Sequence, residues 1–177
     1  SSLNTFFTFL KNNDYIAENP VEKTKRPRAK VEHQVTYLNE EEISTLLNNI
    51  KEIATPMFAT RDLCIVSLGL TTGLRVSAIC NINIDDIDFG TNRIKVIEKG
   101  NKTRYIRFGE KTKEVIFDCI EDRNKYFAGV DTDALFVSRN GNRISTSMVG
   151  VLINKYTTGI TNKHITPHKL RASCATN

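Results

Sequence analysis

The chain has 177 residues, of which 40% are apolar and 25% charged, enough for one hydrophobic core of ordinary size. This apolar content excludes an intrinsically disordered chain, and no window approaches the roughly 18 continuous apolar residues of a membrane helix. The cysteines show no C-x-x-C pair, which argues against a secreted disulfide framework and against a zinc site. We expect a soluble, intracellular protein whose four cysteines are buried small hydrophobes: Cys64, Cys80, Cys119 and Cys174.

Positive charge is concentrated in two parts of the chain. The last 39 residues, 139–177, contain six Lys or Arg and no carboxylate. Residues 19–36 hold a second group of cations around two prolines, namely Lys23, Lys25, Arg26, Arg28 and Lys30. Because proline fixes φ and restrains the residue before it, this stretch is predicted to be an extended linker. Basic segments of this kind either lie along polyphosphate or are simply solvated, and composition leaves both interpretations open.

Apart from this linker, the first 80 residues are predicted to be helical. Asn39 with Glu42 three residues later is typical of a helix N-cap with a capping box. Residues 63–70 are nearly all apolar, which predicts a central buried helix. The expected helices are 1–13, one that begins after Asn39, one that begins at Pro56 and ends near Gly73, and a short one over 74–80.

The second half of the chain begins with a hairpin signal. RIKVIE (93–98) and TRYIRF (103–108) have strand character, and Gly100-Asn101 lies in the turn between them. The other predicted elements are a helix over 110–127, a short strand over 135–137, a turn over 139–142, a helix around 146–156 and a helix from Pro167. The fold class is therefore α+β, a mainly helical domain with a small antiparallel β-sheet.

Asp85, Asp86 and Asp88 form a cluster of carboxylates in the sequence NIDDIDFG. A metal-dependent nuclease would need several acids that converge on two metal ions. These three are nearly consecutive, so their side chains are expected to diverge and to serve in capping and turn formation. We predict no metal ion and no cofactor.

A set of basic residues is the stronger chemical signal. Arg75 lies at the start of a short helix, directly after the buried one, where it meets an anion or pairs with a structural carboxylate. His168 and Arg171 are three residues apart on one face of a helix whose N-terminus favours anions. Lys99 in the hairpin completes the set. Such a set suits phosphodiester chemistry, in which negative charge grows on non-bridging oxygens and on a leaving oxygen.

These residues, in this order, resemble the tyrosine recombinase (phage integrase) family. TTGLRVSAICNINIDDIDF is similar to the family's first arginine motif, IEKGNKTRYIRF to its β-hairpin lysine segment, and HITPHKLRASCAT to its His-x-x-Arg box. FFTFLKNNDYIAENP, a basic linker and YLNEEEISTLL resemble the junction of the core-binding and catalytic domains. The resemblance implies a core-binding remnant over 1–18, a basic interdomain linker over 19–36, and a catalytic domain over 37–177 without its C-terminal nucleophile segment.

The resemblance also implies a mechanism. Arg75 and Arg171 would clamp the scissile phosphate, Lys99 would protonate the 5′-hydroxyl leaving group, and His168 would assist as acid/base or phosphate ligand. A tyrosine on a later helix would attack and form a 3′-phosphotyrosyl link without a metal ion. The implied partners are double-stranded DNA and further copies of the chain, as a tetramer in synapsis. The residues expected to bind DNA are Lys25, Arg26, Arg28, Lys30 and Lys102.

The chain departs from the family pattern at two points. The family commonly has an acidic residue three positions after the first arginine, where this chain has Ala78, so no carboxylate is expected there to support Arg75 or His168. The family's nucleophilic tyrosine follows the His-x-x-Arg box, and this sequence continues for six residues after Arg171. The tyrosines present all precede the box and are predicted to be core or surface residues: Tyr15, Tyr37, Tyr105, Tyr126 and Tyr156.

Taken together, these features predict the catalytic part of an integrase from a mobile element, in the cytoplasm of a bacterial host. Its reaction would be site-specific integration or excision of DNA. The alternative is a DNA-binding module that is related to recombinases but catalyses no reaction. A metal-dependent nuclease built on the three aspartates is a weaker third possibility.

Overall fold

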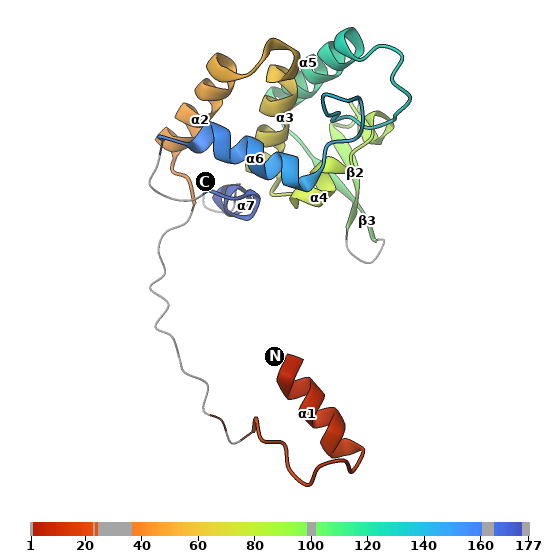
Figure 1. Cartoon of the computed structure of the whole chain (residues 1–177). Coiled ribbons are helices and arrows are strands. Elements are labelled where there is room, and N and C mark those ends of the chain that lie inside the picture. The colour runs from red at the N-terminus through yellow and green to blue at the C-terminus, as the bar shows by residue number, and fades with distance from the viewer. Residues whose placement is uncertain (1, 23, 25–36, 99–101, 161–164, 175–177) are drawn as a thin grey trace. The chain divides into compact units, whose positions relative to one another are not determined.

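The structure is a computed structural model that describes residues 2–22, 24, 37–98, 102–160 and 165–174. The chain divides into two compact units, residues 1–34 and 35–177 (Figure 1). In the described part of the chain, no helix is both long enough and apolar enough to cross a lipid bilayer.

The first unit contains the predicted N-terminal helix, α1 (Ser2–Asn12). The buried Asn19 anchors the following segment on α1, because its side-chain amide donates to Asn4 Oδ1 and Thr8 Oγ1, both at 3.1 Å. The start of the predicted linker therefore lies against α1. Three apolar side chains of the helix are more than half exposed, namely Leu3, Phe6 and Phe9.

Two helices begin the second unit where the sequence predicts them. α2 (Glu40–Ile53) starts at a capping box in which Asn39 Oδ1 accepts from the Glu42 N–H at 2.8 Å and the Glu42 carboxylate accepts from the Asn39 N–H at 2.9 Å. α3 (Pro56–Thr72) has proline at its first position. Its second half is buried as predicted, and α2, α5, α6 and α7 all pack against it (Figure 1).

The four remaining helices lie within two residues of their predicted bounds. They are α4 (Val76–Cys80), α5 (Glu110–Tyr126), α6 (Thr146–Thr157) and α7 (Pro167–Cys174). α6 begins where the Ser145 hydroxyl accepts from the Met148 N–H at 3.1 Å. These caps and prolines are local signals, which is why the sequence predicts the helix starts well.

The sheet has three antiparallel strands in the order β1 (Ile87–Asp88), β2 (Arg93–Glu98) and β3 (Lys102–Arg107). The predicted hairpin is confirmed, with β3 one residue earlier than expected and pairing from Arg93↔Arg107 to Glu98↔Lys102. β1 was not predicted, because two residues are too few for a strand pattern. It pairs only with Arg93 and Ile94, so the same edge of β2 has no partner strand from Lys95 onward among the described residues.

The predicted strand over 135–137 is wrong. This segment makes only isolated bridges, Asn83↔Ala134 and Val137↔Arg143. The two bridges lead to different partners, and the chain turns directly afterwards, where the Ser138 N–H donates to the Asn142 carbonyl at 2.7 Å. No continuous ladder can form, although the segment is buried as its apolar residues require.

The aspartate cluster serves the local backbone, as predicted for Asp86 and Asp88. Asp86 Oδ2 accepts from the Asn83 N–H at 2.9 Å and closes a capping box on a short 3₁₀ helix, η1 (Ile84–Asp86). Asp88 accepts from Thr91 and from the Gly90 N–H, and these hydrogen bonds hold the pKa of its carboxyl below the ordinary value. Among the described residues, no three His, Cys, Asp or Glu side chains lie together so as to hold a metal ion.

A charged residue that the sequence did not single out is buried where α3 meets α6. Asp62, on α3, is 4% exposed and accepts from the Tyr156 hydroxyl at 2.8 Å and from the Arg61 guanidinium at 2.6 and 2.8 Å. Arg61 also donates to the Val137 carbonyl at 2.7 Å and lies over the Phe58 ring. Burial and the bond to Asp62 raise the pKa of Tyr156, so its phenol stays protonated. The predicted packing role of Tyr156 is confirmed.

Three of the four cysteines are buried, as predicted, and Cys174 is half-buried. Burial raises the pKa of the Cys80 thiol to about 11 and that of the Cys64 thiol well above its ordinary value. A thiol needs its thiolate form to react or to bind metal. These two cysteines therefore act as small hydrophobic residues.

Candidate active site

Arg75 is positioned by the turn between α3 and α4. α3 ends at Gly73, which has a left-handed φ of 60° as its C-cap. Leu74 is buried, and Arg75 then forms the N-cap of α4 in an extended conformation with an exposed side chain. The buried neighbour and the glycine turn leave Arg75 at the surface, at the start of the helix where the sequence predicts it.

His168 and Arg171 are positioned by α7. The helix begins after Thr166, whose carbonyl accepts from the Leu170 N–H at 2.9 Å. Leu170 and Ser173 are buried, and the Ser173 hydroxyl accepts from the Leu38 N–H at 2.9 Å. These contacts orient the helix so that His168 is exposed and Arg171 is half-buried.

Gly69, within α3, leaves room for α7 to pack closely on α3, and Gly73 at the end of α3 lies beside α7. A Cβ atom at Gly69 would lie 2.9 Å from Leu170 Cδ2, which is shorter than real Cβ contacts. A Cβ atom at Gly73 would lie 3.4 Å from Cys174 Sγ and 4.0 Å from Arg171 Cγ. The side chain of Arg171 therefore passes beside Gly73, two residues before Arg75. The fold thus places Arg171 beside the turn that leads to Arg75, although the two arginines are 96 positions apart in the sequence.

Several residues of the predicted site lie outside the described part of the chain. Lys99 is one of them, and so are the linker cations Lys25, Arg26, Arg28 and Lys30. Lys102 is described: it is the exposed first residue of β3, paired with Glu98. The roles of all these residues stay predictions.

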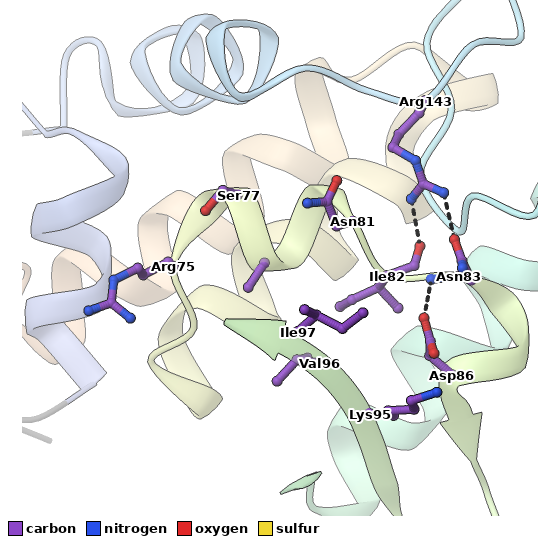
Figure 2. A pocket seen from close by; sticks show the side chains of 11 residues that line it. Arg75, Ser77, Asn81, Ile82, Asn83, Asp86, Lys95, Val96, Ile97 and Arg143 are labelled. Carbon is purple, nitrogen blue, oxygen red and sulfur yellow. Dashed lines mark hydrogen bonds between the residues drawn. The ribbon is translucent and has the colours of Figure 1, made fainter. Parts of the chain in front are cut away.

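A depression of about 760 Å³ lies between α4 and β2, with Arg75 in its lining (Figure 2). Ala78 forms part of its wall, at the position where the family commonly has a carboxylate. Among the described residues of the lining, Asp86 is the only acidic one, and its carboxylate accepts from the Asn83 N–H at 2.9 Å. The polar lining comprises Arg75, Ser77, Asn81, Asn83, Asp86, Lys95 and Arg143.

Arg143 is a residue of this depression that the sequence analysis missed. Its guanidinium donates to the Ile82 carbonyl at 3.2 Å and to Asn83 Oδ1 at 2.5 Å (Figure 2). It also donates to the Cys80 carbonyl at 3.0 Å. It thereby holds the segment that leaves α4 and supports one side of the depression. The only sequence signal was its place in the basic stretch 139–177, which does not distinguish it from the other cations there.

Comparison with known proteins decides the family. The sequence model described as "Phage integrase family" matches residues 36–177, which is most of the chain. The chain belongs to the phage integrase family of tyrosine recombinases. Two of its similar curated relatives are named "Tyrosine recombinase XerC". The one from Caldanaerobacter subterraneus subsp. tengcongensis is 38% identical over 180 residues, covering 99% of this chain and 48% of the relative. The one from Staphylococcus carnosus is 34% identical, covering 100% of this chain and 59% of the relative.

Solved structures of the family agree with the fold. The crystal structure of XerA recombinase matches 98% of this chain and 58% of its own, with 28% identity and a TM-score of 0.70. A Tn1549 transposon integrase in complex with circular intermediate DNA matches 99% of this chain and 62% of its own, with 22% identity and a TM-score of 0.77. The predicted fold class of the integrase-family chain is confirmed. The chain spans about half the length of the curated relatives it matches.

Proposed function

We propose that this chain is the catalytic part of a site-specific recombinase that cuts and rejoins duplex DNA through a 3′-phosphotyrosine intermediate. The observation that carries the proposal is the packing of α7 on α3, which places Arg171 beside Gly73 and hence next to the segment of Arg75. Two guanidinium groups can each bind two oxygens of one phosphate. In a family of tyrosine recombinases, that phosphate is the scissile one.

The four cations share the work of the reaction in this proposal. A tyrosine hydroxyl attacks phosphorus and loses its proton to His168 acting as a base or to water, the bond from phosphorus to the 5′-oxygen breaks, and Lys99 gives the leaving oxygen its proton. Arg75 and Arg171 stabilise the charge that grows on the non-bridging oxygens, and His168 assists as acid/base or phosphate ligand. A 5′-hydroxyl of a partner strand reverses the step, so that no outside energy source is needed.

The biological setting follows from the relatives only in outline. The matches include proteins named XerC as well as the integrases of phage lambda and of a transposon. These names support recombination without selecting a mobile element. We infer that the protein works on double-stranded DNA together with further copies of itself, in the cytoplasm of a bacterial host.

A nicked suicide substrate tests the chemistry. Cleavage of such a duplex releases a short fragment that diffuses away and traps any phosphotyrosine as a covalent adduct. The full-length protein, incubated with a nicked duplex of its recombination site, is expected to give an adduct on a denaturing gel. A single Tyr→Phe change after Arg171 should abolish that adduct.

The control is Tyr105→Phe, an exposed tyrosine of β3, which should leave the adduct unchanged. The 177-residue chain itself should bind DNA and form no adduct, because its last tyrosine, Tyr156, is buried against Asp62. An adduct from the 177-residue chain would show that the nucleophile is misassigned. Full-length protein that binds DNA but never forms one would favour the non-catalytic alternative, in line with Ala78 at the usually acidic position.

The basic linker gives a second prediction, on DNA affinity. Changing Arg26, Arg28 and Lys30 together to Ala should weaken duplex binding across sequences, because each cation that neutralises a phosphate releases counterions from the DNA. The slope of log K against log salt should flatten by roughly one for each phosphate that is no longer neutralised. Fluorescence anisotropy over a range of salt concentrations measures this slope, and an unchanged slope would remove the linker from the DNA interface.

A further inference from the structure

The depression between α4 and β2 is bounded on one side by an open strand edge. β1 covers only Arg93 and Ile94 of this edge. On the other side of β2, the Phe108 N–H donates to the Asn92 carbonyl at 3.0 Å, so residue 92 and every second residue after it face β3. Lys95 and Ile97 must then turn their backbone N–H and C=O groups to the open edge, and both line the depression.

The opposite wall supplies polar side chains from α4. Ser77 and Asn81 are four residues apart on one face of the helix region, and both line the depression. Figure 2 shows both of them on the α4 side of the depression, across from Lys95 on β2. The wall thus presents a hydroxyl and an amide, which are neutral hydrogen-bond donors.

The charge of the depression is positive. Arg75 and Lys95 are exposed in its lining, and Arg143 adds a third cation. Asp86 is the single opposing carboxylate among the residues that line it, and one of its oxygens is already used by the Asn83 N–H. A ligand that is anionic and accepts several hydrogen bonds fits this lining, and Arg75 makes it continuous with the proposed site of the scissile phosphate.

We propose that this depression binds the DNA backbone phosphate that neighbours the scissile one, with Ser77, Asn81 and Lys95 as its ligands. The proposal rests on the proposed function, since the scissile phosphate at Arg75 determines which strand passes here. Lys95 supplies the charge, and Ser77 and Asn81 donate hydrogen bonds to the phosphate oxygens. The contact fixes the position of the strand beside the reacting phosphate.

An open strand edge can also take an extended peptide as an added strand. The observations favour DNA, because two exposed cations line the depression and backbone pairing with a peptide would not need them. A peptide from a second copy of the chain is therefore an outcome of the test below.

The test compares matched single variants of the 177-residue chain in anisotropy titrations with a short synthetic duplex. Lys95→Ala is expected to reduce the slope of log K against log salt by about 0.9, the value for one phosphate that is no longer neutralised. Asn81→Ala removes a hydrogen bond but no charge, so it should weaken binding about 2- to 10-fold with the slope unchanged. Lys125→Ala removes the same charge at the end of α5, outside the depression, and should change neither quantity.

The outcomes separate the two proposals. Wild-type chain that shows no salt-dependent binding would contradict the proposed function itself. Wild-type binding with an unchanged slope in Lys95→Ala would overturn the assignment of the depression and leave the recombinase proposal standing.

A photo-crosslink identifies the occupant directly. p-Azidophenylalanine in place of Asn81, irradiated with the labelled duplex, is expected to give a protein–DNA adduct. A crosslink between two polypeptides instead would assign the open edge of β2 to a strand of a second chain.

Discussion

Replacing Lys99 with alanine is expected to slow DNA cleavage by the full-length protein about 10²–10⁴-fold, the usual contribution of a general acid. The leaving 5′-oxygen needs a proton as its bond to phosphorus breaks, and Arg75 and Arg171 stay charged and cannot supply one. DNA affinity should stay nearly unchanged, because the other cations of the interface remain. Single-turnover cleavage and equilibrium binding, measured on the same duplex, separate the two effects.

A modified substrate distinguishes proton donation from a general loss of charge. With sulfur in place of the 5′-bridging oxygen, the leaving group needs no proton, so the Lys99→Ala variant should cleave it about as fast as the unchanged protein. Lys102→Ala is the matched control, since Lys102 lies on the same hairpin at the start of β3. If only Lys102→Ala is rescued by sulfur, then Lys102 is the acid and Lys99 is not.

Replacing Asp62 with alanine is expected to lower the free energy of unfolding by about 3–5 kcal/mol. The change would leave the Arg61 guanidinium, with a side chain only 13% exposed, without its counter-charge. It would also remove the acceptor of the buried Tyr156 hydroxyl. Urea denaturation of the variant, followed by circular dichroism, measures the loss.

Two variants show whether this cost comes from the buried network. Tyr156→Phe removes one hydrogen bond and should cost about 1–3 kcal/mol. Asp118→Ala removes an exposed carboxylate of α5 and should stay within about 0.5 kcal/mol of the unchanged protein. A loss below about 1 kcal/mol for Asp62→Ala would mean that the Arg61 charge finds another partner or reaches water.

The sequence by itself determined the features that depend on neighbouring residues. The Asn39–Glu42 capping box, Pro56 at a helix start and the Gly73 helix end all appear in the structure where the pattern predicted them. Each satisfies or removes a backbone hydrogen-bonding group within one turn, so a few residues contain the whole physical cause. The β2–β3 hairpin is predicted for the same reason, because a short turn fixes its register.

The tertiary structure determines which of these locally predicted elements pack against one another. The closeness of Arg171 to the Arg75 segment depends on the packing of α7 on α3, where Gly69 leaves room for Leu170, and no local pattern relates residues so far apart. The isolated bridges of Ala134 and Val137 likewise depend on partner residues in other segments, Asn83 and Arg143.

The surroundings of the buried Asp62 and the half-buried Arg143 also depend on the tertiary fold. Asp62 and Arg61 are neighbours in the sequence, and the Arg61 guanidinium donates two hydrogen bonds to the Asp62 carboxylate. The third hydrogen bond, which helps to offset the cost of burying this carboxylate, comes from Tyr156 on α6. Arg143 likewise donates to carbonyls at the end of α4, which lie more than 60 positions earlier in the sequence. Burying a charged group costs free energy unless its partners are in place, and those partners come from distant segments. The helix starts of this protein can therefore be predicted from its sequence, whereas the surroundings of the buried Arg61–Asp62 pair and the candidate active site follow from packing.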